Sequence, residues 1–413
     1  MTTPATRETT PRARPVERAD GVELTLDPVA LEQFLSDYWD RRPLLLQRAE
    51  AGRFDDVLAE RDVHHLIEST GIRTPAFRLV KDGEQLPPHG YTQDIPWRPG
   101  SFSGTAVVER VASEFAAGAT IVLQGLHLHW PAAATYCRAL EMAFACPVQA
   151  NAYYTPAASR GFDLHHDTHD VFVLQVSGTK RWRWHEPVVE LPLKTQKWPG
   201  EHADAGEPAA EVTLKPGDTL YLPRGWPHQA FTSDVHSLHL TIGLHPATRL
   251  DALRAALDEC GDDLEFRRAL GADGTLPPAL LDALSARLRP EAVARRMRRR
   301  FVLGRRPISE GQLAQVANLE RLTVTDLVER RLTVLVDLEF DGDRPVLVFE
   351  GKEVAFPPVA CEAVVDIHGR DAPFTPAELR GALDDAGRLV LVKRLIREGL
   401  LRAAASATET SPA

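Results

Sequence analysis

Short apolar runs, broken by Gly, Pro and Asp, follow one another from about residue 75 to about residue 245. Runs of about four to eight alternating or apolar residues, bounded by such turn formers, are typical of β-strands. Many short strands in succession favour an antiparallel arrangement, so we expect a β domain here. The clearest expected strands are TIVLQGL, DVFVLQV, KRWRWHE, DTLYLP and SLHLTIGLH.

A helix is expected before the β region, in the segment LDPVALEQFLSDYWDRRPLLL. Asp27 is a suitable N-cap, and Pro28 suits the first helical position. Apolar residues then recur at helical spacing from residue 31 to residue 39. The segment therefore predicts an amphipathic helix with one apolar face.

The pattern becomes helical after Pro246 and stays so to about residue 325. Leu250, Leu253 and Leu257 share one helix face, and a second apolar stripe follows in PPALLDALSARL. A single thin helical layer cannot bury both stripes by itself. This segment therefore predicts a homodimer.

A compact C-terminal part follows the helical segment. In FTPAELRGALDDAGRLVLVKRLIREGLL, Thr375 and Glu378 form a capping box, with Pro376 at the first helical position. A second helix is expected near residues 388–398, with a short apolar strand after it. Two short helices that lead into a strand predict a winged-helix-like domain.

These patterns divide the chain of 413 residues into five parts. The N-terminal segment is rich in Thr, Pro and Arg and has little to bury, so it is expected to be disordered. The expected parts are a disordered tail at 1–20, a β domain at 21–246, a helical dimerisation domain at 247–325, a winged-helix-like domain at 326–402 and a second disordered tail at 403–413.

Composition narrows the class of protein. With 44% hydrophobic and 26% charged residues the chain is typical of soluble proteins, and its net charge of −10 argues against a general affinity for nucleic acid. The four cysteines include no CxxC pair, which argues against a zinc ribbon and a disulfide framework. We find no apolar stretch long enough to cross a bilayer and no apolar signal segment, so we expect a cytoplasmic protein with no membrane partner.

One strongly basic run, ARRMRRRFVLGRRP at residues 294–307, contrasts with the acidic balance of the chain. Such a run favours a solvated helix face, or a face that pairs with the acidic surface of a partner chain. A contact with nucleic acid or ribosomal RNA is the alternative.

Metal-binding side chains precede one of the expected strands. The segment FDLHHDTHD places His165 and Asp167 two residues apart, and alternate residues of a strand share a face. A third ligand is expected from another strand, where His228 follows a PGD turn, a short strand and a Pro-rich bend. Two histidines and one carboxylate form the facial triad of non-haem Fe(II) oxygenases, which leaves coordination positions open. His239 is the alternative third ligand.

Several segments resemble the JmjC-domain ribosomal oxygenases, a branch of the cupin and 2-oxoglutarate-dependent oxygenases. FLSDYWDRRPLLL, NAYYTP, HHDTHDVFVLQVSGTKRW and GDTLYLPRGWPHQA follow in the order found in that family. The resemblance implies a mainly β fold with α elements, a double-stranded β-helix of the jelly-roll or cupin type, in the catalytic domain. It also implies the helical dimerisation domain and the winged-helix-like domain.

The resemblance implies roles for further residues. Lys180, fifteen positions after His165, would bind the distal carboxylate of 2-oxoglutarate. Thr241 and Asn151 would be neutral hydrogen-bonding partners of this cosubstrate, and Tyr153 would contact the substrate. On spacing alone, a turn residue after the Ser-Gly-Thr sequence is an equal alternative for Lys180.

The implied activity is hydroxylation with Fe(II), 2-oxoglutarate and dioxygen, which yields succinate and carbon dioxide. The implied substrate is a ribosomal protein, and Asn151 and Tyr153 favour a histidine, hydroxylated on its β carbon, over an arginine. Gly243 stands where the histidine branch is expected to have serine, and Asp163 and Asp170 would suit a guanidinium, so arginine stays open. Two further functions stay open: a hydroxylase of a small molecule or free peptide, and a non-catalytic metal-binding cupin module.

Neighbouring residues are expected to have structural roles. His166 and Asp170 would be polar neighbours that point away from the metal, and His169 would be a loop residue or an outer partner of the ligands. Trp182 and Trp184 alternate out of a strand, and packing in the core is sufficient to explain them.

Overall fold

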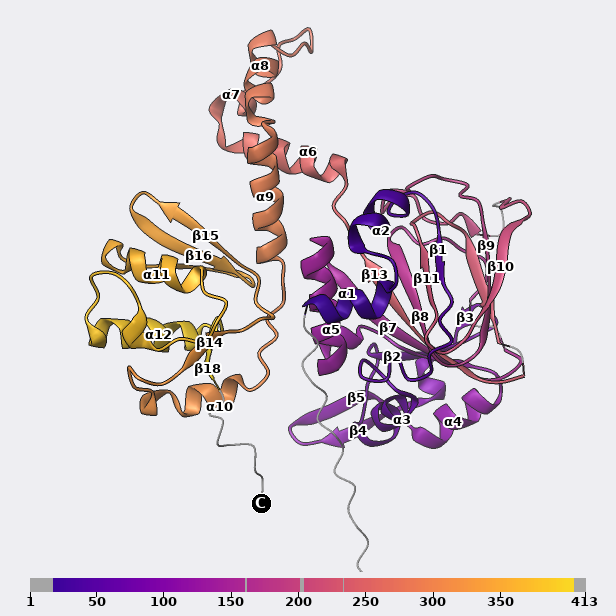
Figure 1. Ribbon diagram of the computed structural model, residues 1–413. Coiled ribbons are helices and arrows are strands. Elements are labelled where there is room, and N and C mark those ends of the chain that lie inside the picture. The colour runs from indigo at the N-terminus through magenta and orange to yellow at the C-terminus, as the bar shows by residue number, and fades with distance from the viewer. Residues whose placement is uncertain (1–17, 160–161, 201–203, 233, 405–413) are drawn as a thin grey trace, which may run out of the picture. The chain divides into compact units, whose positions relative to one another are not determined.

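The computed structural model describes residues 18–159, 162–200, 204–232 and 234–404 (Figure 1). The predicted disordered tails at 1–20 and 403–413 lie largely outside the described residues. Their inner ends do not: helix α1 covers Arg18–Leu26, and strand β18 covers Leu401–Ala403. At these ends the predicted tails extend too far into ordered structure.

The chain forms two compact units. The first comprises Met1–Phe144 and Val148–His245, and the second comprises Ala145–Pro147 and Pro246–Ala413. Each is described by itself below.

Two antiparallel sheets form the framework of the first unit. Within the described residues, the larger sheet has eight strands in the order β1-β11-β8-β13-β7-β6-β2-β3, and the smaller has three in the order β10-β9-β12. The strands of the larger sheet are β1 (Leu44–Leu46), β2 (Phe77–Lys81), β3 (Glu84–Gln85), β6 (Thr120–Leu123), β7 (Val148–Thr155), β8 (Asp170–Gly178), β11 (Thr219–Leu222) and β13 (Ser237–Leu244). Those of the smaller sheet are β9 (Lys180–His185), β10 (Pro208–Leu214) and β12 (His228–Phe231). The five strands predicted from the sequence are confirmed.

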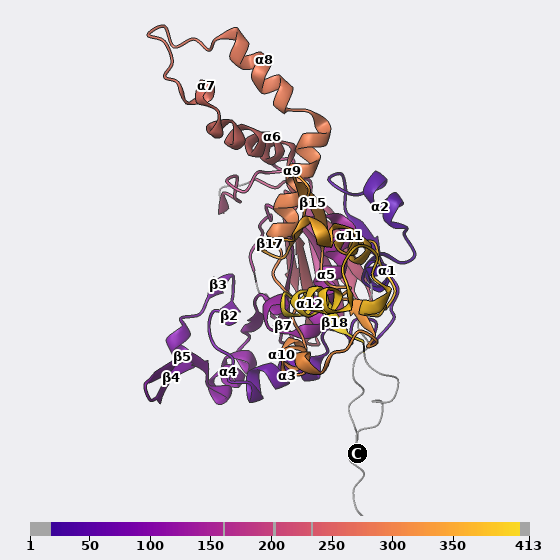
Figure 2. The ribbon, with the colours of Figure 1, turned by 90° about the vertical axis from the view of Figure 1, so that its left-hand side faces the viewer.

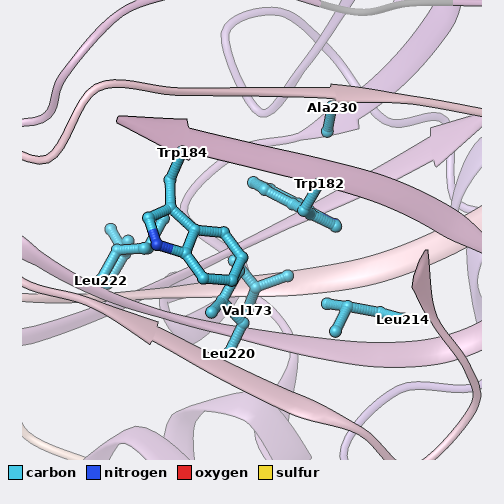
Figure 3. Close-up of a cluster of buried hydrophobic side chains, with 8 residues drawn as sticks. Val173, Trp182, Trp184, Leu214, Leu220, Leu222 and Ala230 are labelled. Atoms are coloured by element: carbon cyan, nitrogen blue, oxygen red, sulfur yellow. The ribbon is translucent and has the colours of Figure 1, made fainter. Parts of the chain in front are cut away.

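A hydrophobic core joins the two sheets (Figure 3). Trp182 and Trp184 project from β9 of the smaller sheet toward apolar residues of the larger one. The buried members of this cluster are Val171, Val173, Trp182, Trp184, Leu214, Leu220, Leu222 and Ala230. Each large apolar side chain contributes about 1.5–3 kcal/mol when fully buried, so the cluster holds the two sheets face to face. The packing role expected for the two tryptophans is confirmed.

Helices and one hairpin complete the first unit. The helices are α1 (Arg18–Leu26), α2 (Leu31–Asp37), α3 (Glu60–Ser69), α4 (Val108–Ala116) and α5 (Pro131–Phe144). The hairpin consists of β4 (Thr92–Trp97) and β5 (Gly100–Ala106).

The helix predicted to start at Asp27 starts later. Helix α2 begins at Leu31, and Ala30 occupies its N-cap position without a side-chain hydrogen bond. The backbone N–H of Asp27 instead donates to the carbonyl of Glu23 at 3.0 Å, which places Asp27 at the C-terminal end of α1. Because α1 was not predicted, a turn between two helices was read as a helix start. Of the expected apolar face, Phe34 is the fully buried residue of α2.

The second unit combines helices with two small sheets, β14-β18 and β15-β16-β17 (Figure 2). Its helices are α6 (Arg249–Asp258), α7 (Leu264–Arg267), α8 (Pro278–Arg287), α9 (Pro290–Leu303), α10 (Gln312–Ala317), α11 (Cys361–His368) and α12 (Asp385–Arg397). Its strands are β14 (Val328–Arg330), β15 (Val336–Asp341), β16 (Arg344–Phe349), β17 (Lys352–Ala355) and β18. In the part of the chain that the structure describes, we find no helix with the length and apolar character needed to cross a membrane.

The first of the two helices predicted in the winged-helix-like region is absent, so that prediction is wrong. The capping box of Thr375 and Glu378 is present, but it opens a single 3₁₀ turn at Pro376–Glu378. Leu379 is already extended, with φ −64° and ψ 135°, and its side chain is buried. Burial of Leu379 outweighs the local helix signal. The helix that precedes α12 is α11, and the expected strand after α12 is β18.

Three of the seven arginines in the basic run at 294–307 form ion pairs with carboxylates of their own unit. Within α9, Arg298 forms an ion pair with Asp337 of β15 at 2.9 Å. Two neighbouring arginines are paired in the same way: Arg296 with Glu259, and Arg299 with Glu339 and Glu353. Arginines paired in this way are less available to phosphate groups.

Candidate metal centre and adjoining cavity

Three metal-binding side chains converge at one end of the β domain. One ligand atom from each of His165, Asp167 and His228 lies within 4.8 Å of the others. His228 is the first residue of β12, whereas His165 and Asp167 lie in the bend that precedes β8 rather than within a strand. The strand placement assumed in the sequence analysis is therefore wrong for these two residues, although they still face one point.

A backbone bridge brings the two histidines together. The N–H of His228 donates to the carbonyl of His165 at 2.8 Å, and the N–H of His165 donates back at 3.2 Å. This isolated antiparallel pair sets the imidazole centroids 4.7 Å apart. The bend in the chain therefore satisfies its backbone groups and aims two ligands at the same space.

Both imidazoles have one nitrogen tied to the backbone. Nδ1 of His165 donates to the carbonyl of Asp163 at 2.7 Å, and Nδ1 of His228 donates to the carbonyl of Trp226 at 3.0 Å. A carbonyl accepts only from a protonated nitrogen, so Nε2 of each ring keeps its lone pair. Nε2 of His228 lies 3.8 Å from Oδ2 of Asp167. Each ring thus presents a metal-binding atom toward the carboxylate.

The electrostatic environment holds these groups in the protonation states of metal ligands. Burial, followed by the charge of His165, lowers the pKa of His228 to about 4. Burial alone would raise the pKa of Asp167, but the imidazoles around it, led by His169 and His228, outweigh that effect and lower it. At neutral pH the site therefore consists of a carboxylate with a neutral imidazole from His228. This donor set suits a divalent first-row metal and leaves one coordination face open.

A cavity of about 250 Å³ adjoins the triad. Its polar lining includes Lys180, Thr241, Tyr153 and His239, together with the three triad residues. Among the described residues that line it, Asp167 is the single carboxylate. The cavity therefore joins a candidate metal centre to a pocket with cationic and neutral polar walls.

Lys180 is the buried cation of this cavity. It is the first residue of β9, and 4% of its surface is exposed. Its Nζ donates to Oγ1 of Thr155 at 3.0 Å, and burial lowers its pKa to about 7. A buried ammonium is costly without a counter-charge. An anion that enters the cavity would supply one.

The other residues implied by the resemblance lie on two neighbouring strands. Thr241 of β13 lines the cavity and pairs with Asn151 of β7 across the sheet. Asn151 is not part of the lining, and its Oδ1 accepts from the backbone N–H of Gly125 at 2.9 Å. Tyr153 lines the cavity, and burial raises the pKa of its hydroxyl to about 12.

His239, the alternative third ligand, lies outside the triad. Its ring stacks on Tyr153, with centroids 4.9 Å apart and an interplanar angle of 5°. Burial, and then the charge of Lys180, lowers its pKa well below the usual value. It forms a wall of the cavity beside Lys180 rather than a fourth corner of the metal centre.

Two residues were missed by the sequence analysis: one is the hydrogen-bonding partner of Lys180, and the other lines the cavity. Thr155, the hydrogen-bonding partner of Lys180, also accepts from Oγ1 of Thr120 at 3.1 Å. Arg78 of β2 lines the cavity and stacks its guanidinium 5.3 Å from the ring of Phe162. Thr155 ends the NAYYT strand and shares a strand face with Asn151 and Tyr153, so alternation along the strand could have identified it. The sequence around Arg78 contains no comparable signal.

Comparisons with known proteins agree with this geometry. The sequence profile of the JmjC domain matches residues 127–251, a stretch that contains all three triad residues. The chain therefore contains a JmjC domain, and its curated relatives include a ribosomal oxygenase. The predicted fold, a JmjC-type double-stranded β-helix, is thereby confirmed.

Curated relatives of this JmjC-domain protein carry enzyme names. The chain is 31% identical over 231 residues to the bifunctional lysine-specific demethylase and histidyl-hydroxylase NO66 of Drosophila persimilis, covering 53% of this chain and 30% of that protein. It is 30% identical over 274 residues to ribosomal oxygenase 1 of Gallus gallus, covering 63% of this chain and 44% of that protein. The chain thus spans less than half the length of both relatives.

A solved structure shows the same fold over almost the whole chain. It is YcfD, a ribosomal oxygenase from Escherichia coli, in complex with cobalt and 2-oxoglutarate. The two chains are 17% identical with a TM-score of 0.53, and the match covers 92% of this chain and 100% of YcfD.

Proposed function

We propose that this JmjC-domain protein is an Fe(II)- and 2-oxoglutarate-dependent oxygenase that hydroxylates a protein side chain. One observation carries the proposal: the His165, Asp167 and His228 triad opens onto the cavity that holds the buried side chain of Lys180, which forms no ion pair with the residues that the structure describes. A metal with open positions and a nearby anion-binding cation are what a chelating dicarboxylate requires. A metal held for structure alone has no use for Lys180.

The residues present fit both groups. His165, Asp167 and His228 would hold Fe(II), and Lys180, with Thr155 and Thr241 beside it, would hold the distal carboxylate of 2-oxoglutarate. Bound together, the metal, 2-oxoglutarate and dioxygen supply the oxidising power for C–H hydroxylation, with succinate and carbon dioxide as co-products. The protein orients these partners and lines the site with apolar walls such as Val171 and Val173.

A histidine side chain suits this site better than an arginine. A guanidinium would need a free carboxylate, and the cavity already contains two cations, Lys180 and Arg78. Asp170, one candidate partner for arginine, is fully buried and pairs with the guanidinium of Arg224 at 3.4 Å. Asp163, the other candidate, lies against Gly83 in the turn between β2 and β3. A neutral imidazole needs no such carboxylate.

A ribosomal protein is the proposed substrate, because the relatives include a histidyl-hydroxylase and ribosomal oxygenases. The purified enzyme is expected to add one oxygen to a histidine of a ribosomal protein taken from cells that lack it. The reaction contains Fe(II), 2-oxoglutarate and air, and intact-mass analysis followed by fragmentation locates the oxygen. Omission of 2-oxoglutarate is the control. Oxygen gain at an arginine would correct the residue type.

If no ribosomal protein gains oxygen, two alternative functions remain, and succinate formation distinguishes them. Succinate formed with a metabolite extract instead would move this chain to the hydroxylases of small molecules. Fe(II) binding without succinate from either source would make it a non-catalytic metal-binding module.

We also propose that the protein is a homodimer held by its helical segment. Leu253 and Leu257 of α6 and Leu281 of α8 are 47%, 48% and 53% exposed, and they lie in the segment for which an interface between copies is expected. The combined Leu253→Glu and Leu281→Glu variant is expected to be monomeric in light scattering, because charge at an apolar interface is costly. Leu313→Glu, at a leucine of α10 that is 89% exposed, is the matched control and should stay dimeric. A dimeric double variant would place the interface elsewhere.

A further inference from the structure

A glycine interrupts β13 where the backbone does not require one. Gly243 is followed by a single strand residue, and its φ is outside the left-handed region that favours glycine. Glycine inside a strand weakens it, and often marks a place where another group approaches the backbone closely. The group at Gly243 is an imidazole: a Cβ at this position would lie 2.8 Å from both Cδ2 and Nε2 of His169.

The position of Gly243 shows that His169 lies beside the cavity-facing side chains of β13. His239, Thr241 and Gly243 alternate along β13 and share one face of the sheet, and the first two line the cavity. The imidazole of His169 therefore lies over the next position of the cavity-facing row. It also lies within electrostatic reach of the carboxylate of Asp167, two residues before it. His169 thus flanks the metal centre on the side where the row of β13 side chains ends.

The ring of His169 is held in place by packing rather than by hydrogen bonds. It stacks on His245, with centroids 4.5 Å apart and an interplanar angle of 22°. Among the residues that the structure describes, none hydrogen-bonds to either of its ring nitrogens, in contrast to His165, His166 and His228. The residue is only half-buried. An oriented imidazole with unused hydrogen-bonding groups beside a metal centre is suited to hold an incoming side chain.

We propose that His169, positioned by Gly243 and His245, hydrogen-bonds the protein side chain that is hydroxylated and orients it toward the metal centre. The inference rests on the proposed function and specifies part of its substrate contact. A neutral imidazole offers one N–H donor and one nitrogen acceptor, so it matches a target that has the same pair, such as a histidine side chain. His169 acts here as a positioning residue for the substrate, and Gly243 supplies the space that it needs.

The test compares His169→Ala, Gly243→Ala and the double variant in the full-length enzyme. The probe is a synthetic peptide of about 20 residues, centred on the histidine that gains oxygen with the wild-type enzyme. Loss of one hydrogen bond is expected to raise the peptide KM about three- to tenfold, while the KM for 2-oxoglutarate stays close to the wild-type value. Gly243→Ala should give the same defect, because its methyl group displaces the ring. The double variant should be no worse than either single one, since both remove the same contact.

Matched controls come from two adjacent exposed residues. His89→Ala removes an exposed histidine, and Gly90→Ala adds a Cβ where no atom lies within 4 Å. His169→Asn keeps one donor and one acceptor, and should recover part of the peptide affinity. If Gly243→Ala is unstable, the double variant should regain most of its melting temperature, because the clash with His169 is gone and the contact with Cγ of Gln149, at 3.0 Å, remains.

Two results would overturn the inference and leave the proposed function intact. One is a wild-type peptide KM for His169→Ala. The other is an equal rise in the KM values of peptide and 2-oxoglutarate, which would make His169 a support of the metal site. Absence of any peptide oxidation by the wild-type enzyme would instead remove the proposed function, and this inference with it.

Discussion

His228→Ala is expected to abolish hydroxylation and to remove stoichiometric Fe(II) binding while the protein stays folded. Loss of even an outer partner of a metal ligand costs about 10- to 100-fold in affinity or activity, so loss of a direct ligand should cost at least that. The fold should survive because the backbone hydrogen bonds between His165 and His228 do not involve the side chain. Metal content after anaerobic loading with Fe(II), and succinate formation, measure the two effects.

His239→Ala is the matched control for this prediction. Both histidines are buried, at 6% and 3% exposure, but His239 stacks on Tyr153 and is not part of the triad. Its variant should keep full metal content. If His239→Ala lost the iron and His228→Ala retained it, the third ligand would be His239 and the proposed triad would be wrong.

Lys180→Ala is expected to weaken 2-oxoglutarate binding about tenfold to a hundredfold. A hydrogen bond to a charged group contributes about 1.5–3 kcal/mol, which corresponds to that range. The KM for 2-oxoglutarate in a succinate assay measures the effect. Unchanged succinate release at low 2-oxoglutarate would exclude Lys180 from the cosubstrate site.

The lowered pKa of Lys180 gives this site a pH dependence. Because burial brings the pKa to about 7, the ligand-free protein loses the ammonium as the pH rises above that value. The affinity for 2-oxoglutarate should therefore fall between pH 7 and pH 9. Lys180→Arg should bind with a flatter profile, since a guanidinium stays charged. A wild-type profile as flat as that of the variant would contradict the assignment.

The lowered pKa of Lys180 also means that its charged form destabilises the folded, ligand-free protein. Its folded-state pKa lies below its value of 10.5 in the unfolded chain, so the unfolded state binds more protons between these two values. The stability contributed by this group is therefore lowest below pH 7 and recovers as the pH rises toward 10.5. Lys180→Met should raise the melting temperature near neutral pH.

Local patterns predicted the strands well and the chain connections between them poorly. DVFVLQV and SLHLTIGLH are long apolar runs, and burial on both faces of a sheet leaves few other states open to them. The start of α2 was missed because its boundary depends on α1, which has too weak an apolar pattern to be recognised. The 3₁₀ turn after Thr375 was read as a helix because a capping box satisfies the first turn of either.

Part of the candidate site could be predicted from the sequence, and part of it could not. His165, Asp167 and His228 were proposed from residue type and spacing, and the structure brings their ligand atoms together, but through a bend and a bridge rather than through strand parity. The contact of Gly243 with His169 has no local signal. It depends on how a bend packs on a strand 74 positions later in the chain, and sequence spacing does not report such contacts.

The bridge between His165 and His228 links the occupancy of the metal centre to the mobility of the backbone. The same two residues that offer ring nitrogens exchange their amide hydrogen bonds, so a bound ion would restrain both ends of this pair at once. Deuterium uptake at these two amides should slow when Co(II) or Zn(II) binds and quicken when a chelator removes it. The two amides would then report whether the site is loaded, without cosubstrate, dioxygen or any knowledge of the target protein.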